Sequence, residues 1–162
     1  MTKVPNGQIF HFDVDLLSRG MNITTEEVVQ YFTDGRRVSF LLERRIAREI
    51  MKGTLAQSEG AAWDVVDANG DKWEVRSLSR QGVYFCPSYM VGSGRAFDEE
   101  GFLKKLDEIR GYAVSDIDCF PDVPVWLIES DEVRKWYLSG ELGINSKVSR
   151  VKALKLFEGW AS

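Results

Sequence analysis

A short hairpin places the tightest constraint on what this chain can fold into. Residues 63–79 read WDVVDANGDKWEVRSLS, with two runs of strand-forming residues on either side of Asn69-Gly70. An Asn-Gly pair tolerates the positive φ angles of a tight turn, so residues 68–70 are expected to reverse the chain. The sequence therefore predicts antiparallel strands over 63–66 and 72–78.

The hairpin brings charged side chains together. Residues in a strand alternate between its two faces, so Glu74 and Arg76 share one face of the second strand. Asp64 lies on the partner strand and is expected to join them. Two converging carboxylates are suitable ligands for a hard divalent cation such as Mg²⁺.

This arrangement resembles the PD-(D/E)xK nucleases, and in particular the small type II restriction endonucleases. An Asp on one strand is followed, ten positions later, by Glu-x-(basic residue) on the next strand. The resemblance covers residues 64–77 and returns weakly near the C-terminus, over about half of the chain in all. Its C-terminal matches are residues 134–137, Gly140, residues 144–145 and residues 151–152.

The resemblance implies an α/β (α+β) chain with the restriction-endonuclease-like fold, a mixed central sheet flanked by helices. Residues 1–162 would form a single nuclease-like domain, long enough for one core. The implied activity is Mg²⁺-dependent hydrolysis of double-stranded DNA at a specific site, with Mn²⁺ as a substitute metal. A homodimer is expected, because two copies of one active site would cut the two strands of a two-fold DNA site.

The same resemblance assigns roles to individual residues. Asp64 and Glu74 would bind the metal together with the carbonyl of Val75. Nucleases of this fold often add a helix carboxylate, for which Glu43 is the better candidate and Glu59 the weaker one. Bound Mg²⁺ would lower the pKa of a water molecule and neutralise charge on the phosphate.

The sequence departs from the family pattern at two positions. Arg76 stands where the family has Lys, and Trp63 replaces the Pro before the Asp. Arg does not give up its proton, so Arg76 cannot act as a general base. Its planar guanidinium could still hold the scissile phosphate, which makes Arg76 a candidate catalytic residue.

The charge distribution bears on DNA binding. The net charge is −4, but two segments are basic, and the fold could join them into one positive face. The first spans residues 36–52, and the second contains Lys147 and Arg150 as candidate phosphate contacts. Because the resembled enzymes read DNA with the segment after the catalytic strand, Ser88, Tyr89 and Arg95 are further candidate DNA contacts.

Other features of the sequence narrow the possibilities. Cys86 and Cys119 stand far apart without a CxxC or His pattern, so both are expected to be buried thiols rather than zinc ligands. No apolar run approaches the length of a membrane span, and the N-terminus lacks a signal pattern. A cytoplasmic protein without a membrane partner is expected.

Hydrophobic periodicity and capping residues predict the remaining elements. Helices are expected from Thr24 to about residue 32, with Asp34-Gly35 ending that helix, and over 39–52, 98–109 and 130–137. Strands are expected over 112–117 and 123–128. Residues 82–90 are predicted to be extended, and residues 151–157 to form a strand or a helix.

Two other interpretations remain open. The same fold could carry a catalytically impaired site and serve as a DNA- or protein-binding module, which Arg76 favours. The chain could also be a small α/β protein of unrelated function. In that case the cluster would be a cross-strand salt bridge between Asp64 and Arg76, or a solvated pair of Glu74 with Lys72.

Overall fold

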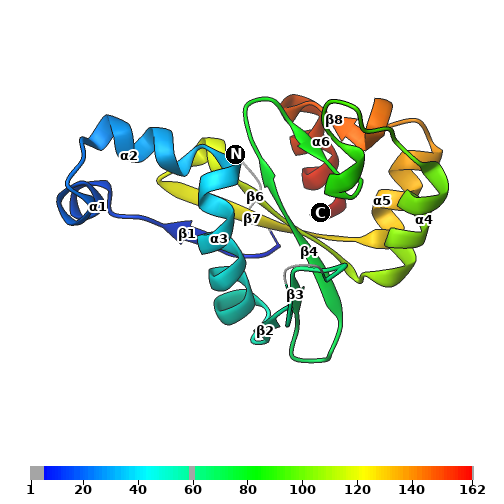
Figure 1. Cartoon of the computed structure of the whole chain (residues 1–162), viewed down its shortest axis with the longest axis horizontal. Coiled ribbons are helices and arrows are strands. Elements are labelled where there is room, and N and C mark those ends of the chain that lie inside the picture. Colours follow the sequence, from blue (N-terminus) through cyan, green and yellow to red (C-terminus); the bar gives the residue numbers. More distant parts are fainter. Residues whose placement is uncertain (1–5, 59–60, 162) are drawn as a thin grey trace.

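The computed structural model describes residues 6–58 and 61–161, and its centre is a six-stranded mixed sheet (Figure 1). The strands of this sheet are β1 (Ile9–His11), β2 (Thr54–Leu55), β3 (Val65–Val66), β4 (Lys72–Leu78), β6 (Gly111–Asp116) and β7 (Asp122–Glu129). They are arranged in the order β1-β7-β6-β4-β3-β2. β4 and β6 run parallel, whereas the other neighbouring pairs are antiparallel. Two further strands, β5 (Val83–Tyr84) and β8 (Lys147–Val148), pair with each other.

Helices surround this sheet, and most of them begin at a capping side chain. They are α1 (Val14–Met21), α2 (Thr25–Phe32), α3 (Gly35–Arg45), α4 (Glu99–Glu108), α5 (Ser130–Leu138) and α6 (Arg150–Ala161). A π-helical segment, Ile46–Ile50, continues α3, and short 3₁₀ turns lie at Ser88–Met90, Ile117–Cys119 and Ile144–Ser146. The Thr24 and Asp98 side chains each accept a hydrogen bond from the third backbone N–H after them, which fixes the starts of α2 and α4.

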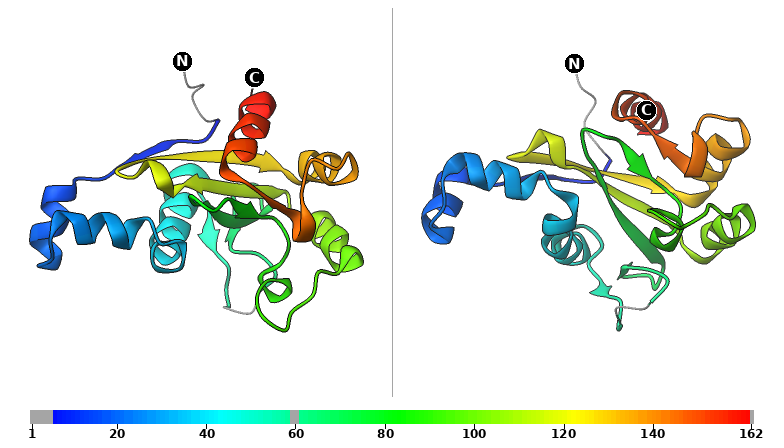
Figure 2. Two further views of the ribbon diagram at one scale, coloured as in Figure 1. Left: turned by 90° about the horizontal axis from the view of Figure 1, so that it is seen from above. Right: turned by 45° about the horizontal axis from the view of Figure 1, so that its top comes forward.

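Apolar side chains pack on both faces of the sheet. One core joins α2, α3 and the π-helical segment to the face that carries Val75 and Ala113. The other core joins α4, α5 and α6 to the face that carries Leu78 and Tyr112. Figure 2 shows α3 and α6 on opposite sides of the strands. The alternation along β4 and β6 therefore divides these strands between two cores, as expected for central strands covered by helices on both faces.

The predicted mixed central sheet flanked by helices is confirmed. The hairpin is also confirmed: β3 and β4 are antiparallel and Gly70 has a φ angle of +85°. Residues 151–157, for which a strand or a helix is predicted, lie within the helix α6. Among the described residues, no helix is long and apolar enough to cross a membrane.

Three details of the sequence-based prediction are wrong. Asp34 does not end a helix; its carboxylate accepts a hydrogen bond from the Arg36 N–H and begins α3. The extended segment is shorter than predicted, because only Val83–Tyr84 is a strand and Ser88–Met90 turns. Cys119 is exposed rather than buried, since the turn after β6 leaves it at the surface.

The close packing of β6 between β7 and β4 requires a glycine at position 111. A Cβ atom there would lie 2.3 Å from the Ile128 carbonyl oxygen and 2.9 Å from the Trp73 ring. We expect Gly111→Ala to reduce the free energy of unfolding by about 1–3 kcal/mol, because the strands would have to move apart. Urea denaturation would measure the loss.

Gly20→Ala is the matched control, because a Cβ atom at this helical position meets no atom within 4 Å. Its stability should be unchanged or slightly higher. Equal stability of Gly111→Ala and the wild type would contradict the close approach of the strands.

Candidate functional site

The site lies where β3 separates from β4. The Asp64 N–H still donates to the Trp73 carbonyl, but the next bond toward β4 comes from a side chain. The Val75 N–H donates to Asp64 Oδ2 at 2.8 Å, in place of a strand partner. The edge of β4 is therefore open from Val75 onward, and the Asp64 carboxylate covers its first open backbone group.

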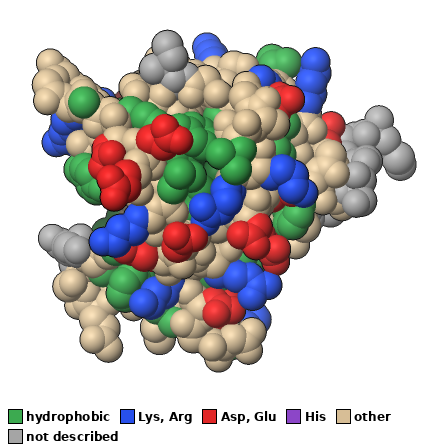
Figure 3. All heavy atoms as spheres, turned by 90° about the vertical axis from the view of Figure 1, so that its right-hand side faces the viewer, with side chains coloured by type: hydrophobic (Ala, Val, Ile, Leu, Met, Phe, Trp, Pro, Cys, Tyr) green, Lys and Arg blue, Asp and Glu red, His purple; other side chains and the backbone are tan. Residues whose placement is uncertain are grey.

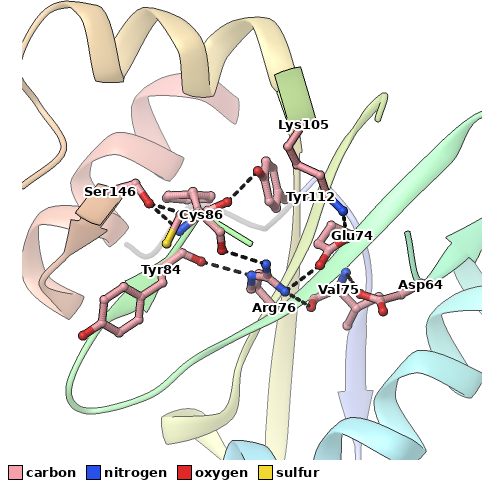
Figure 4. Close-up of polar contacts among 10 residues, drawn as sticks. Asp64, Glu74, Val75, Arg76, Tyr84, Cys86, Lys105, Tyr112 and Ser146 are labelled. Carbon is pink, nitrogen blue, oxygen red and sulfur yellow. Dashed lines mark hydrogen bonds and ion pairs between the residues drawn. The ribbon is translucent and has the colours of Figure 1, made fainter. Parts of the chain in front are cut away.

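Glu74 and Arg76 point to the same face of β4, as alternation predicts (Figure 4). Arg76 Nη1 donates to Glu74 Oε1 at 2.8 Å, and both side chains are largely buried. Glu74 does not pair with Lys72, and Arg76 does not pair with Asp64, among the ion pairs of residues 6–58 and 61–161. The predicted salt bridges Asp64–Arg76 and Glu74–Lys72 are therefore both wrong. Glu74 is also buried rather than on a solvated face.

The remaining donors of Arg76 hold a neighbouring backbone segment. Arg76 Nε donates to the Tyr84 carbonyl at 3.1 Å, and Nη2 donates to the Cys86 carbonyl at 3.0 Å. Nη1 also lies 3.4 Å from the Val75 carbonyl oxygen. A guanidinium has five N–H groups in a fixed plane, and here they are directed at four acceptors. Arg76 therefore acts as a fixed link between β4 and residues 84–86.

Two other side chains hold the same segment from the opposite side. The hydroxyl of buried Tyr112 donates to the Phe85 carbonyl at 2.7 Å. The Ser146 hydroxyl accepts from the Phe85 and Cys86 N–H groups at 3.3 and 2.7 Å. Burial raises the pKa of the Tyr112 hydroxyl, so it remains a neutral donor. Residues 84–86 are thus fixed beside the charged pair.

A second cation reaches Glu74 from helix α4. Lys105 Nζ lies 3.0 Å from Glu74 Oε2, and each of these side chains is 10% exposed. That oxygen accepts no hydrogen bond of good geometry from the described residues, although the ammonium is within ion-pair distance. Glu74 thus lies between two cations, with Arg76 at one oxygen and Lys105 at the other.

Two further carboxylates face this cluster with raised pKa values. Burial, and then the negative charge of Glu74, raises the pKa of Asp64. Burial, and then the charges of Asp64 and Glu74, raises the pKa of Glu43 to about 6, against the opposing effect of Arg44. Glu43 is carried by α3, which packs on one face of the sheet, whereas Glu74 points to the other face. The effect of Asp64 and Glu74 on Glu43 indicates that the three predicted carboxylates lie in the same part of the structure.

The donor set is chemically suited to a hard divalent cation. The charge of Glu74 raises the pKa of Asp64, and the charges of both raise that of Glu43, so an added positive charge would stabilise these carboxylates. Asp64 and Glu74 could hold the ion, with the Val75 carbonyl and Glu43 beside them. Within the described ranges, no three His, Cys, Asp or Glu side chains form a compact metal-binding group, so these groups would have to move closer around an ion. Glu59 lies outside the described residues.

The cluster opens onto two hollows of the surface. A cavity of about 450 Å³ is lined by Glu74, Lys105, Ser88 and Tyr89, among others. A more open groove of about 1070 Å³ is lined by Arg36, Arg76, Ser88 and Lys147, among others. Ser88 lines both hollows, which are therefore adjacent. The cavity lies beside Glu74 and the groove beside Arg76, so the two hollows extend along β4. The groove brings one residue from each predicted basic segment to the same depression.

The structure separates the predicted DNA contacts into two groups. Ser88, Tyr89 and Lys147 line the hollows, and Tyr89 is 64% exposed. Arg95 instead folds back on its own loop, where it donates to the Ser88 and Val91 carbonyls at 3.0 and 3.2 Å. Arg150 does not line either hollow and is ion-paired with Asp116 and with Asp118, which borders the groove.

The face that carries α4 and α5 has a different character. Figure 3 shows acidic and basic side chains interleaved on it. Arg134 pairs with Asp107, and Arg110 pairs with both Asp71 and Glu129. Charges that neutralise one another leave little attraction for a polyanion, so the groove is the better candidate for a phosphate backbone.

Lys105 is the residue at this site that sequence reasoning missed. It lies in the helix expected over 98–109, on which the apolar residues Phe102 and Leu106 indicate the core-facing side. A signal was present, since Lys105 stands three residues after Phe102 and therefore on the same face of the helix. A lysine at a core-facing position predicts a buried partner.

The raised pKa of Glu43 predicts a pH-dependent stability in the absence of metal. Folding raises this pKa, so the folded state binds the proton more tightly and loses stability as the pH rises toward about 6. Glu43→Gln removes that penalty. We expect its melting temperature in EDTA to exceed that of the wild type by about 1–3 °C at pH 7.5, after solvent screening, and to match it near pH 4.

Glu49→Gln is the contrasting control on the same helical stretch. A hydrogen bond from Arg45 lowers the pKa of Glu49. The ionised Glu49 therefore stabilises the folded state at neutral pH, and this stabilisation is lost as the pH falls. This variant should melt at a lower temperature than the wild type at pH 7.5. A destabilised Glu43→Gln at that pH would show that Glu43 is favourably paired.

The role of Arg76 as a fixed link predicts that lysine cannot replace it structurally. Arg76→Lys keeps the charge but leaves the Tyr84 and Cys86 carbonyls without their donor. We expect a loss of about 1–3 kcal/mol in the free energy of unfolding. Arg80→Lys is the control, because the Arg80 side chain is 89% exposed. Equal urea midpoints for both variants would contradict the proposed link.

Comparison with known proteins adds no further assignment. A search against models of protein families found no match, and no curated protein matches the chain significantly. The chemistry of this site must therefore be inferred from its residues and their geometry.

Proposed function

We propose that this chain is a Mg²⁺-dependent endonuclease that hydrolyses phosphodiester bonds of double-stranded DNA at a specific site. Its fold would be the restriction-endonuclease-like one, with the site at the open edge of a mixed sheet. The single observation that carries the proposal is the placement of Asp64 and Glu74 on either side of Val75 at that edge, where Asp64 Oδ2 accepts from the Val75 N–H and Glu74 is largely buried. The charges of Asp64 and Glu74 also raise the pKa of Glu43, as is expected of carboxylates near a cation site.

The charges of the site suit this chemistry. At neutral pH the three carboxylates are close to balanced by three cations, because Arg76 and Lys105 pair with Glu74 and Arg44 acts on Glu43. A divalent cation would make the site positive and attractive to a phosphodiester. When bound there, Mg²⁺ would supply a water molecule of lowered pKa and neutralise charge on the phosphate.

The reaction needs no covalent intermediate. The oxygen of one water molecule forms a bond to phosphorus, and the bond from phosphorus to one bridging oxygen breaks. Water loses one proton to solvent, and the departing oxygen gains one, which leaves a phosphate end and a hydroxyl end. The fixed segment 84–86 and Arg76 would keep Glu74 in place during these changes.

The hollows beside the site provide a path for the substrate. Lys147 and Arg36 line the groove on one side of Arg76, and Ser88 and Tyr89 lie at the cavity on the other side. Contacts from Lys and Arg to phosphates position a duplex without reading its sequence. Cutting both strands requires two such sites, which supports a homodimer on two-fold DNA.

One observation favours a second candidate function. Both Glu74 oxygens already face cations, and the hydrogen bonds of Arg76 within the described residues go to Glu74 and to backbone carbonyls. A site neutralised in this way without metal could be a nuclease fold that binds DNA or protein but no longer cleaves. The two candidates differ in whether added metal activates cleavage.

A plasmid assay tests the proposal. Purified protein is incubated with supercoiled DNA in Mg²⁺, Mn²⁺ or EDTA, beside Glu74→Gln and Asp64→Asn. We expect discrete metal-dependent fragments from the wild type. Each variant should lose at least about 100-fold in rate, because it removes a charge that acts directly on the reacting groups.

Asp107→Asn is the matched control, since this carboxylate on α4 is 72% exposed and should leave the rate unchanged. Absence of cleavage on all plasmids and metals would refute the nuclease proposal. Duplex binding with a steep salt dependence in that case would support the binding module.

A further inference from the structure

The position of Lys105 is unusual for a lysine. Its neighbours on the same face of α4, Phe102 and Leu106, are fully buried in the core, and Lys105 itself is only 8% exposed. Placing an ammonium at such a position is costly unless it is paired. The partner is Glu74, from a strand that precedes the helix by about 30 positions in the chain.

Neutralising Glu74 does not require this lysine. Arg76 already provides a charge-assisted hydrogen bond to Glu74 Oε1 at 2.8 Å. Lys105 Nζ lies 3.0 Å from the other oxygen, yet that oxygen accepts no hydrogen bond of good geometry from the described part of the chain. The ammonium therefore forms an ion pair with Glu74, and this contact does not use all three of its donors.

The ammonium also borders open space. Lys105 and Glu74 both line the cavity of about 450 Å³, together with Ser88 and Tyr89. A ligand in this cavity can therefore reach Nζ although little of the side chain is exposed. Figure 4 shows Lys105 approaching Glu74 from the side opposite to Arg76.

Arg76 is less suited to contact a ligand. Its donors are directed at Glu74 and at the carbonyls of Val75, Tyr84 and Cys86. Releasing one of them would leave a buried acceptor without a donor. An ammonium, in contrast, has three donors and can rotate them toward a phosphate oxygen.

We infer that Lys105 is the catalytic cation that contacts the scissile phosphate, and that Arg76 is a positioning residue. This inference rests on the proposed nuclease function. Lys105 donates to a non-bridging phosphate oxygen and stabilises the negative charge that develops there as water attacks. The nuclease pattern has its catalytic lysine two residues after the Glu, at the position of Arg76. Here helix α4 supplies that positive charge instead, through Lys105.

The test compares Lys105→Met and Lys105→Arg with the wild type on a plasmid that the wild type cleaves. Single-turnover rates in Mg²⁺ measure catalysis, and the duplex Kd in Ca²⁺ measures binding without turnover. We expect Lys105→Met to lose about 100- to 1000-fold in rate, with a Kd within about threefold of the wild type. Lys105→Arg should recover at least about tenfold over Lys105→Met, because it restores the charge.

Lys135→Met is the control, since this helical lysine on α5 has a side chain 75% exposed. Its rate and melting temperature should match the wild type. If Lys105→Met melts below the assay temperature, Lys105→Gln, which keeps an amide donor for Glu74, takes its place with the same expected loss of rate.

The possible outcomes separate the two proposals. Wild-type cleavage with a Lys105→Met rate within threefold of it would overturn the role of Lys105 and leave the nuclease proposal intact. A loss of rate that Lys105→Arg does not recover would also overturn it, because a cation at this position would not be what matters. A wild-type protein that cleaves no DNA would refute the nuclease proposal and this inference with it.

Discussion

The guanidinium of Arg76 is the interaction on which the site depends. A planar cation that is mostly enclosed must satisfy its donors, and here the acceptors are Glu74 and the backbone of residues 84–86. This requirement fixes the segment after β4 against the strand itself. Tyr112 and Ser146 complete the arrangement by bonding the remaining polar groups of that segment. Because a buried acceptor that loses its donor costs free energy, each of these contacts supports the others.

The position of Arg76 also explains a departure from the resembled sequence pattern. A lysine at this position could neutralise Glu74 but could not bond two separate carbonyls in the same plane. An arginine that holds the backbone is less able to contact a substrate. The site has a second cation, Lys105 on α4, which lies beside an open cavity. The two cations therefore differ in how readily a ligand can reach them. One has its donors occupied by protein oxygens, while the other lies next to space that a ligand can fill.

Local patterns predicted most of the sheet and the core of the site. Alternation along 72–78 placed Glu74 and Arg76 on one face, and the Asn69-Gly70 turn brought Asp64 to them, because these features depend only on neighbouring residues. Lys105 was not predicted to belong to the site, since its partner Glu74 lies far away in sequence. Asp34 was misassigned because an Asp-Gly pair can end one helix or cap the next. The exposure of Cys119 depends on how the turn after β6 packs, which periodicity does not determine.

The charged groups reach the edge of β4 from both sides of the sheet. Glu43 is carried by α3, which packs on one core, and Lys105 is carried by α4, which packs on the other. The spacing between these groups therefore depends on how two separate helices lie against a single strand. A substitution deep in either core could change that spacing without touching a charged residue. Variation within the hydrophobic interior would then alter the geometry at the edge, so that the two cores help to determine the activity proposed for the site.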